Sequence, residues 1–167
     1  VVAYGCTSAT VVLGENKIFN AIKSIHPGAL CTTPITAAFE AFKRLNAKKI
    51  AVLTPYRNDV NQYILNYIEG AGFSVTTFGS FNEENDPIVA CIDKESIING
   101  IKKIIQNQKV DMVFVSCTSI KFMEYVLELE SEIGIPVTTS NHAMAWHTMK
   151  LAGINKMFPD FGKLYQT

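Results

Sequence analysis

The chain has 167 residues, a length that suits one ordinary domain or two small lobes. Hydrophobic residues make up 48% of it and charged residues 18%, as in a globular protein with a substantial core. The formal net charge is zero, which argues against a nucleic acid or an anionic membrane as partner, and no apolar run approaches the roughly 20 residues that span a bilayer.

The first part of the chain predicts only two short strands. Apolar residues at 1–4 and 29–32 favour strands, with helices between and after them. Two strands make half of an α/β lobe, and a complete lobe needs about two more βα units of roughly 30 residues each. We therefore expect this chain, which does not begin with Met, to be a piece of a longer protein that is neither stable nor active without its N-terminal part.

From Lys49 onward strands and helices alternate. The predicted strands cover 50–53, 73–78, 111–116 and 136–139, and the predicted helices cover 60–70, 96–106, 120–133 and 141–151. Ser140 or Asn141 is the expected N-cap of the last helix. This order indicates right-handed βαβ units and parallel sheets, an α/β fold. Residues 36–138 are predicted to form a complete second lobe of flavodoxin type, and residues 1–35 with 139–167 a partial first lobe.

One tripeptide occurs twice, as Cys6-Thr7-Ser8 and as Cys117-Thr118-Ser119. Each copy follows an apolar run and precedes a stretch that can be helical. Because ligands of open α/β sheets bind beyond the carboxyl ends of the strands, both thiols are expected at that edge. A helix that begins there would bind a carboxylate through its free N–H groups and the Thr and Ser hydroxyls, and would favour the thiolate.

Two such thiols can perform acid–base or covalent chemistry from opposite sides of a substrate. A thiolate beside a bound carboxylate can remove a proton from the adjacent carbon or add to a double bond, and the second thiol can return a proton. This chemistry requires neither a metal nor an organic cofactor, and we expect neither. A single Cys at a strand end is usually just a small buried residue, but the duplication at matched junctions favours a functional interpretation.

The other thiols and the histidines carry weaker signals. Cys31 and Cys91 lack the tripeptide context and are expected to pack in the core. No CxxC pair indicates a zinc site, and His142 and His147 have the wrong spacing for a shared metal face on one helix. A disulfide framework is not expected in a chain with this core, so reduced thiols in a cytoplasm are the default.

Four segments together resemble a known group, the aspartate/glutamate racemase superfamily and, within it, the maleate cis–trans isomerase and arylmalonate decarboxylase branch. They are Gly-Cys-Thr-Ser-Ala-Thr at 5–10, Leu-Thr-Pro-Tyr at 53–56, Ser-Cys-Thr-Ser at 116–119 and Asn-His-Ala-Met-Ala-Trp-His at 141–147. The resemblance implies two flavodoxin-like lobes related by a pseudo-twofold, the N-terminal one incomplete here. It also implies a cofactor-independent site in the cleft between them.

The resemblance also implies residue roles. Cys6 matches the nucleophile that attacks the double bond of maleate to give a succinyl-cysteine intermediate, and Cys117 matches the thiol that supplies or removes a proton. Tyr56 and, in the polar loop before Ile88, Asn85 match residues that bind substrate carboxylate. The hydroxyls of Thr7, Ser8, Thr118 and Ser119 are the remaining predicted contacts. A tyrosine in the position of Tyr56 can equally be a packing residue of the cleft wall.

Several activities stay open at this point. Amino-acid racemases of the superfamily use two thiols but have Cys-Asn-Thr and Gly-Cys-Thr-Glu or Gly-Cys-Thr-His motifs, and arylmalonate decarboxylases lack the first Cys. The ectoine-utilisation protein shares the Asn-x-Ala-x-Ala-Trp-His run. A carboxylate-binding homologue without turnover is an alternative of another class. The partner is a small carboxylate or dicarboxylate in all cases, and family members commonly form homodimers.

Overall fold

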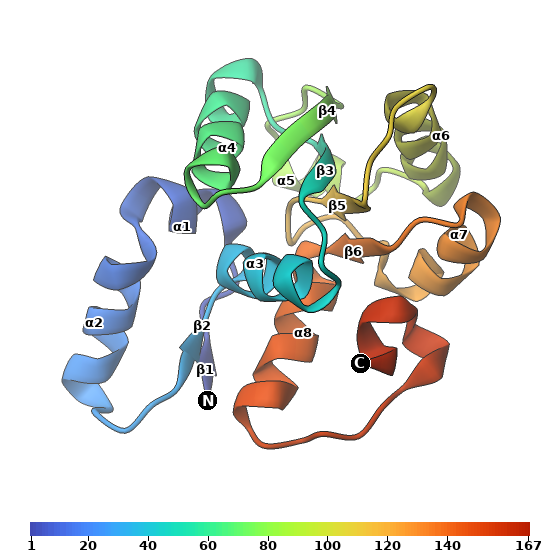
Figure 1. The fold of residues 1–167 in the computed structure, drawn as a ribbon. Helices are drawn as coiled ribbons and strands as arrows, with labels where there is room; N and C mark the ends of the chain where they lie inside the picture. The colour runs from blue at the N-terminus through green and yellow to red at the C-terminus, as the bar shows by residue number, and fades with distance from the viewer.

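The computed structural model describes residues 1–167 and contains six β-strands and eight α-helices (Figure 1). The strands are β1 (Val2–Ala3), β2 (Cys31–Thr32), β3 (Lys49–Thr54), β4 (Ser74–Ser80), β5 (Met112–Val115) and β6 (Val137–Thr139). The helices are α1 (Thr7–Leu13), α2 (Glu15–Ile25), α3 (Pro34–Arg44), α4 (Asn58–Gly70), α5 (Asp86–Val89), α6 (Lys94–Ile105), α7 (Val126–Ile133) and α8 (Ser140–Leu151).

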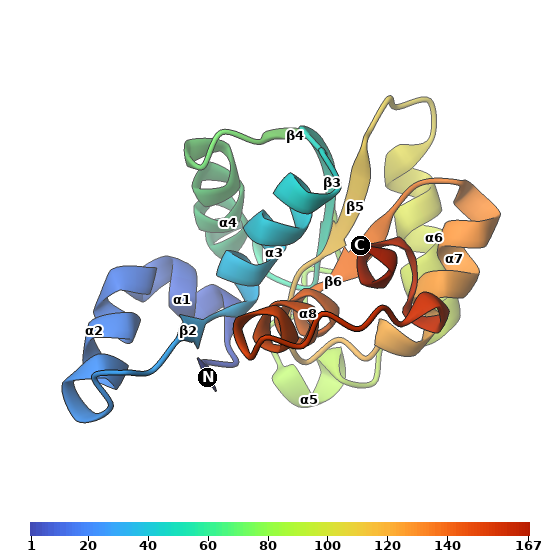
Figure 2. The ribbon, with the colours of Figure 1, turned by 60° about the horizontal axis from the view of Figure 1, so that its bottom comes forward.

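A four-stranded parallel sheet in the order β4-β3-β5-β6 forms the centre of the molecule. Its strand residues alternate between two cores, as the pleat requires. Leu53 and Val113 belong to the core under α6 and α7, whereas Val52 and Phe114 belong to the core under α3 and α4. The helices therefore cover both faces of the sheet, with α3 and α4 on one side and α6 and α7 on the other (Figure 2).

A second parallel sheet consists of β1 and β2 alone, with Val2 opposite Cys31. It lies with α1 and α2 beside the larger sheet (Figures 1 and 2). Glu15, at the start of α2, ties this part to α3 and α4, because its carboxylate accepts hydrogen bonds from Thr36 and, at 2.7 Å, from the hydroxyl of Tyr67.

The C-terminal segment packs against α3 and α8. Leu164 and Tyr165 share a small core with Ala37, Ala143 and Trp146. His142 is buried beside it and donates from Nε2 to the carbonyl of Phe161 at 2.7 Å. Its Nδ1 therefore accepts from the hydroxyl of Thr138, at 2.9 Å. Burial lowers the pKa of His142 to about 4.

The α/β fold with parallel sheets is confirmed, and most predicted elements lie within a few residues of their expected positions. The start of the predicted helix 120–133 is wrong, since a 3₁₀ turn at Met123–Tyr125 precedes α7, which begins only at Val126. The residues before it follow a loop that inserts Ile120 and Phe122 into the core. No helix is long and apolar enough to cross a membrane. The division into lobes at 36 and 138 stays a prediction.

Candidate active site

The two Cys-Thr-Ser tripeptides lie just after β1 and β5, and their loops contact each other. The hydroxyl of Thr118 donates to the carbonyl oxygen of Gly5 at 3.2 Å. Cys6 is half-buried, and its thiol lies 3.8 Å from the hydroxyl of Ser8, whereas Cys117 is only 4% exposed. The fold thus brings together two segments that are more than one hundred residues apart in the chain.

The prediction that a helix begins at each thiol holds only for Cys6, which is the N-cap residue of the short helix α1. At Cys117 it is wrong. Cys117 has φ of 122°, outside the helical region, and α7 starts nine residues later. Its neighbours use their polar groups locally instead, since the Ser119 N–H donates to the Cys117 thiol at 3.4 Å and the Ser119 hydroxyl to Asp86 at 3.2 Å.

Two residues from the start of α8 complete this junction, and the sequence did not identify them as site residues. Ser140 Oγ accepts from the Cys117 N–H at 3.0 Å and lies 2.9 Å from Thr7 Oγ1. Asn141 donates to the carbonyl of Thr118 at 2.9 Å. Neither is the N-cap, contrary to prediction: Thr139 caps α8 by accepting from the His142 N–H. The rule that strand ends share one edge of a parallel sheet applied to β6 as well, and could have drawn attention to both residues.

Tyr56 stands next to both thiols. Burial raises the pKa of its hydroxyl well above the usual value, and the side chains of Cys117 and Cys6 raise this pKa further. Only the hydroxyl of Ser116 lowers it. Ser116 Oγ itself is buried and forms no hydrogen bond of acceptable geometry. Tyr56 therefore stays protonated at neutral pH, so its O–H remains available as a donor near the thiols.

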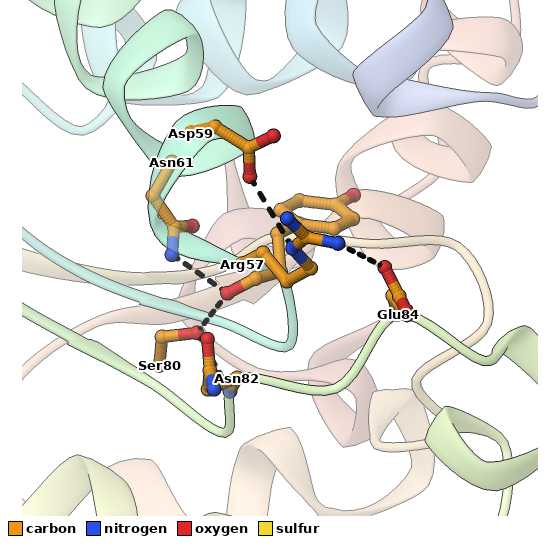
Figure 3. A network of polar contacts seen from close by, with 7 residues as sticks. Arg57, Asp59, Asn61, Ser80, Asn82 and Glu84 are labelled. Carbon is orange, nitrogen blue, oxygen red and sulfur yellow. Dashed lines mark hydrogen bonds and ion pairs between the residues drawn. The ribbon is translucent and has the colours of Figure 1, made fainter.

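The backbone of Tyr56 is held from two sides. Asn61 donates to its carbonyl at 2.7 Å, and Ser80 donates to the same oxygen (Figure 3). Asn61 is anchored in turn by Thr54, whose hydroxyl donates to Asn61 Oδ1 at 2.6 Å. The residue after Tyr56 is Arg57, which pairs with Glu84 at 2.8 Å across the exposed edge of the site (Figure 3).

Asn85 is exposed at the start of α5, and its side chain makes no hydrogen bond. Its main-chain N–H donates to Glu83 at 2.8 Å. The neighbouring residue Asp86, not Asn85, contacts the Cys117 loop through Ser119. The structure therefore does not bring Asn85 into the group formed by the other predicted site residues.

A hollow of about 550 Å³ opens beside the thiols, and Ser8 and Tyr56 form part of its wall. Neither Cys6 nor Cys117 lines it. Helix α1 contributes an apolar side, and the opposite rim is acidic. The lining residues are Ser8, Ala9, Val12, Leu13, Tyr56, Arg57, Asp59, Val60, Glu83, Glu84 and Asp86. Arg57 is the one cation in this hollow, beside four carboxylates. If one carboxylate of a substrate binds near the thiols and a second enters this hollow, the second would depend on Arg57 for an attractive charge.

The remaining thiols differ from the pair. Cys31 is half-buried in β2, and its thiol donates to the carbonyl of Ala29 at 3.6 Å. Cys91 is exposed, so the prediction that it packs in the core is wrong, because the chain leaves α5 at the surface there. No group of three or more His, Cys, Asp or Glu side chains is placed to hold a metal ion.

These residues form a site with two thiols, one neutral phenol and several hydroxyl and amide donors. Such donors suit a carboxylate, and a pair of thiols beside them suits addition to, or proton transfer at, the adjacent carbon.

The model of the arylmalonate decarboxylase family matches residues 15–165. The chain belongs to this family. Among curated relatives of this family member, the maleate isomerase of Nocardia farcinica is 23% identical over 98% of the chain and 68% of its own length. The maleate isomerase of Pseudomonas putida is 26% identical with the same coverage. The arylmalonate decarboxylase of Bordetella bronchiseptica is 25% identical over 83% of the chain and 58% of its own length.

Solved structures show the same fold as this family member. A mutant of the Nocardia farcinica maleate cis–trans isomerase with a covalently bound succinylcysteine intermediate superposes with a TM-score of 0.91 at 23% identity, over 99% of this chain and 71% of that one. Arylmalonate decarboxylase superposes with a TM-score of 0.83 at 24% identity, over 98% of this chain and 74% of the other. The match to both groups confirms the expected superfamily.

Proposed function

We propose that the protein is a cofactor-independent cis–trans isomerase of a small dicarboxylate of the maleate type. The observation that carries the proposal is the direct contact between the two Cys-Thr-Ser loops, with the protonated hydroxyl of Tyr56 near both thiols. The maleate isomerases among its relatives support the choice of substrate class. A cytoplasmic location and a homodimer stay predictions.

The reaction we propose balances within the site. The Cys6 thiolate adds to one alkene carbon, so a C–S bond forms and the π electrons move to the other carbon, beside a carboxylate. Cys117 gives that carbon a proton, and the resulting succinyl adduct rotates about its C–C single bond. Cys117 then takes a proton back, the C–S bond breaks, and the trans alkene leaves with the Cys6 thiolate restored.

The carboxylates need donors during these steps. Thr7, Ser8, Tyr56, Thr118 and Ser119 supply hydroxyls on the two loops and at the end of β3. Such donors stabilise the charge that develops on the carboxylate next to the carbanion. The hydroxyls of Thr118 and Ser119, which donate to Gly5 and Asp86 in this structure, have to turn toward the substrate to take part. The role of Asn85 stays a prediction that no side-chain contact supports.

Incubation of the full-length protein with maleate, followed by intact mass and peptide mapping, tests the proposal. We expect fumarate in solution from the wild type. In Cys117→Ser a succinate-sized adduct should accumulate on Cys6, because water can still protonate the carbanion but no thiol remains to remove the proton. Cys6→Ala should abolish turnover. Cys91→Ser is the matched control, since its thiol is exposed and makes no hydrogen bond. Activity of Cys6→Ala within about tenfold of wild type, a loss of only about 1.4 kcal/mol, would refute the covalent route.

The same preparation separates the alternatives. Exchange of the α-proton of aspartate or glutamate without a maleate adduct would indicate a racemase, and loss of CO₂ from an arylmalonate would indicate a decarboxylase. Action on an intermediate of ectoine breakdown alone would indicate an ectoine-utilisation protein. Binding of dicarboxylates with no turnover of any of them would leave the non-catalytic carboxylate-binding homologue.

A further inference from the structure

Ser140 joins the two thiol loops from a third element. It is the first residue of α8 and is completely buried. Its Oγ accepts from the N–H of Cys117 and lies 2.9 Å from the hydroxyl of Thr7. It is thus the one side chain that hydrogen-bonds a residue of each Cys-Thr-Ser tripeptide.

The Cys117 side of this junction is strained. A non-glycine residue at φ of 122° costs on the order of 1–3 kcal/mol and persists only where its surroundings hold it. The start of α8 holds both ends of the Cys117–Thr118 unit, with Ser140 on the N–H of Cys117 and Asn141 on the carbonyl of Thr118. The first turn of α8 therefore fixes the direction of the Cys117 backbone.

The Thr7 side follows from counting protons. Three donors meet here, namely the N–H of Cys117 and the hydroxyls of Ser140 and Thr7. These groups form only two hydrogen bonds, and the two hydroxyl oxygens are the only acceptors among them. One O–H is left without a protein partner. If Ser140 kept it, a hydroxyl with no exposed surface would be orphaned, at a cost of about 1–3 kcal/mol. If Ser140 donates to Thr7, the free proton is that of Thr7, which is itself only 1% exposed but lies one residue from Cys6, so that a substrate bound to that thiol can place a carboxylate oxygen beside it.

We propose that Ser140 is a positioning residue that turns the Thr7 hydroxyl into a donor for substrate carboxylate and locks it to the Cys117 backbone. The inference rests on the proposed function and deepens it. Ser140 does not touch substrate. It acts through Thr7 and Cys117, so that binding of one carboxylate is coupled to the geometry of the thiol on the opposite loop.

A merely structural role for Ser140 predicts different results from a positioning role. A structural Ser140 would lower stability when removed and would leave affinity for carboxylate nearly intact. Thr138 offers the matched control for this case. It is also buried at the β6–α8 junction, and its hydroxyl bonds His142 rather than a thiol loop.

The test is calorimetric titration of the purified protein with succinate, a dicarboxylate that has no double bond to react. We expect about tenfold weaker binding in Ser140→Ala and in Thr7→Val, and no further loss in the double variant, because both remove one chain of hydrogen bonds. Ser140→Cys, which keeps the size but accepts poorly, should behave as Ser140→Ala. Thr7→Ser keeps the hydroxyl and should bind more tightly than Thr7→Val. Thr138→Val should bind as wild type despite its lower melting temperature.

Unchanged affinity in Ser140→Ala, or losses that multiply in the double variant, would overturn the proposal. Exchange of the Cys117 amide proton with solvent provides an arm that needs no ligand. It should accelerate at least tenfold in Ser140→Ala but not in Thr138→Val, and equal exchange in both variants would also overturn the proposal. If the wild type neither converts maleate nor binds succinate, the proposed function fails, and the amide arm alone decides whether Ser140 holds Cys117.

Discussion

The backbone strain at Cys117 predicts that glycine is tolerated there far better than at an ordinary cysteine. Replacing Ala by Gly in a strand costs about 0.5–1 kcal/mol through backbone entropy, and about 0.8 kcal/mol more for each buried methyl. Both costs apply at Cys117 and at Cys31, which has an ordinary strand backbone in β2. Only at Cys117 does glycine also relieve a φ of 122°, which contributes on the order of 1–3 kcal/mol in the other direction.

The measurement compares four variants, Cys117→Ala, Cys117→Gly, Cys31→Ala and Cys31→Gly, by urea unfolding with linear extrapolation. At Cys31 the glycine variant should be less stable than the alanine variant. At Cys117 that gap should close or reverse, so that the two gaps differ by about 1–3 kcal/mol, or roughly 2–4 °C in melting temperature for each kcal/mol. The same alanine-to-glycine penalty at both positions, with unchanged m values, would refute the assignment of strain to Cys117.

Three further predictions concern groups outside the thiol loops. Since burial lowers the pKa of His142 to about 4, the unfolded chain takes up a proton first as pH falls, and the free energy of unfolding should drop by about 2 kcal/mol between pH 7.5 and 5. Urea titrations should show that this loss of unfolding free energy at low pH is smaller in His142→Gln. Burial raises the pKa of Glu130, which increases the unfolding free energy as pH falls, but this effect is the same in the wild type and in His142→Gln. Tyr67→Phe removes the bond to Glu15 and should lower unfolding free energy by about 1 kcal/mol, with faster proteolysis in α2, whereas unchanged proteolysis would mean that Glu15 does not hold that helix. Glu84→Gln should lower KM for maleate, most clearly at low salt, because it removes a carboxylate from the rim and releases Arg57 from its ion pair with Glu84. An unchanged KM would show that the acidic hollow takes no part in substrate binding.

The sequence predicted the parts of this fold that depend on local pattern. Runs such as Ile50–Leu53 and Met112–Val115 are apolar on both faces, which identifies strands buried between helix layers. Given the strand before each thiol, the carboxyl-edge rule was enough to expect Cys6 and Cys117 each at the carboxyl edge of its own sheet. These inferences hold because the pattern of burial repeats over several residues and one irregular position does not disturb it.

The remaining features depend on single backbone angles and on contacts distant in sequence. The stretch from Ile120 to Ile133 as a whole was predicted as a helix, but the positive φ at Cys117 sends the chain into a loop that buries Ile120 and Phe122. Ser140 was predicted only as a possible cap, because nothing in its own neighbourhood shows that Thr7 lies 2.9 Å away. Asn85 was predicted by motif alone, and nothing in the sequence of that polar loop shows that it is Asp86 whose side chain contacts Ser119.

The two halves of the site are built alike, and the difference between them explains why identical tripeptides occupy unequal environments. In each half a threonine at or next to the end of a strand contacts a histidine of α8, Thr32 with His147 at 2.8 Å and Thr138 with His142 at 2.9 Å. In each half the next threonine caps a helix, α3 or α8.

The first helical residue breaks the match. In α8 it is Ser140, which accepts from the N–H of Cys117, whereas in α3 it is Pro34, which has neither a side-chain acceptor nor an N–H. Cys6 has an extended backbone with φ of −141° and a half-buried thiol, while Cys117 is held at φ of 122° and almost enclosed. A half-buried thiol can reach an alkene and form a bond to it, whereas an enclosed thiol beside Tyr56 is better placed to exchange a proton. The start of α8 thus differs from the start of α3 by Ser140 in place of Pro34, and this difference accompanies the unequal roles that we propose for the two thiols.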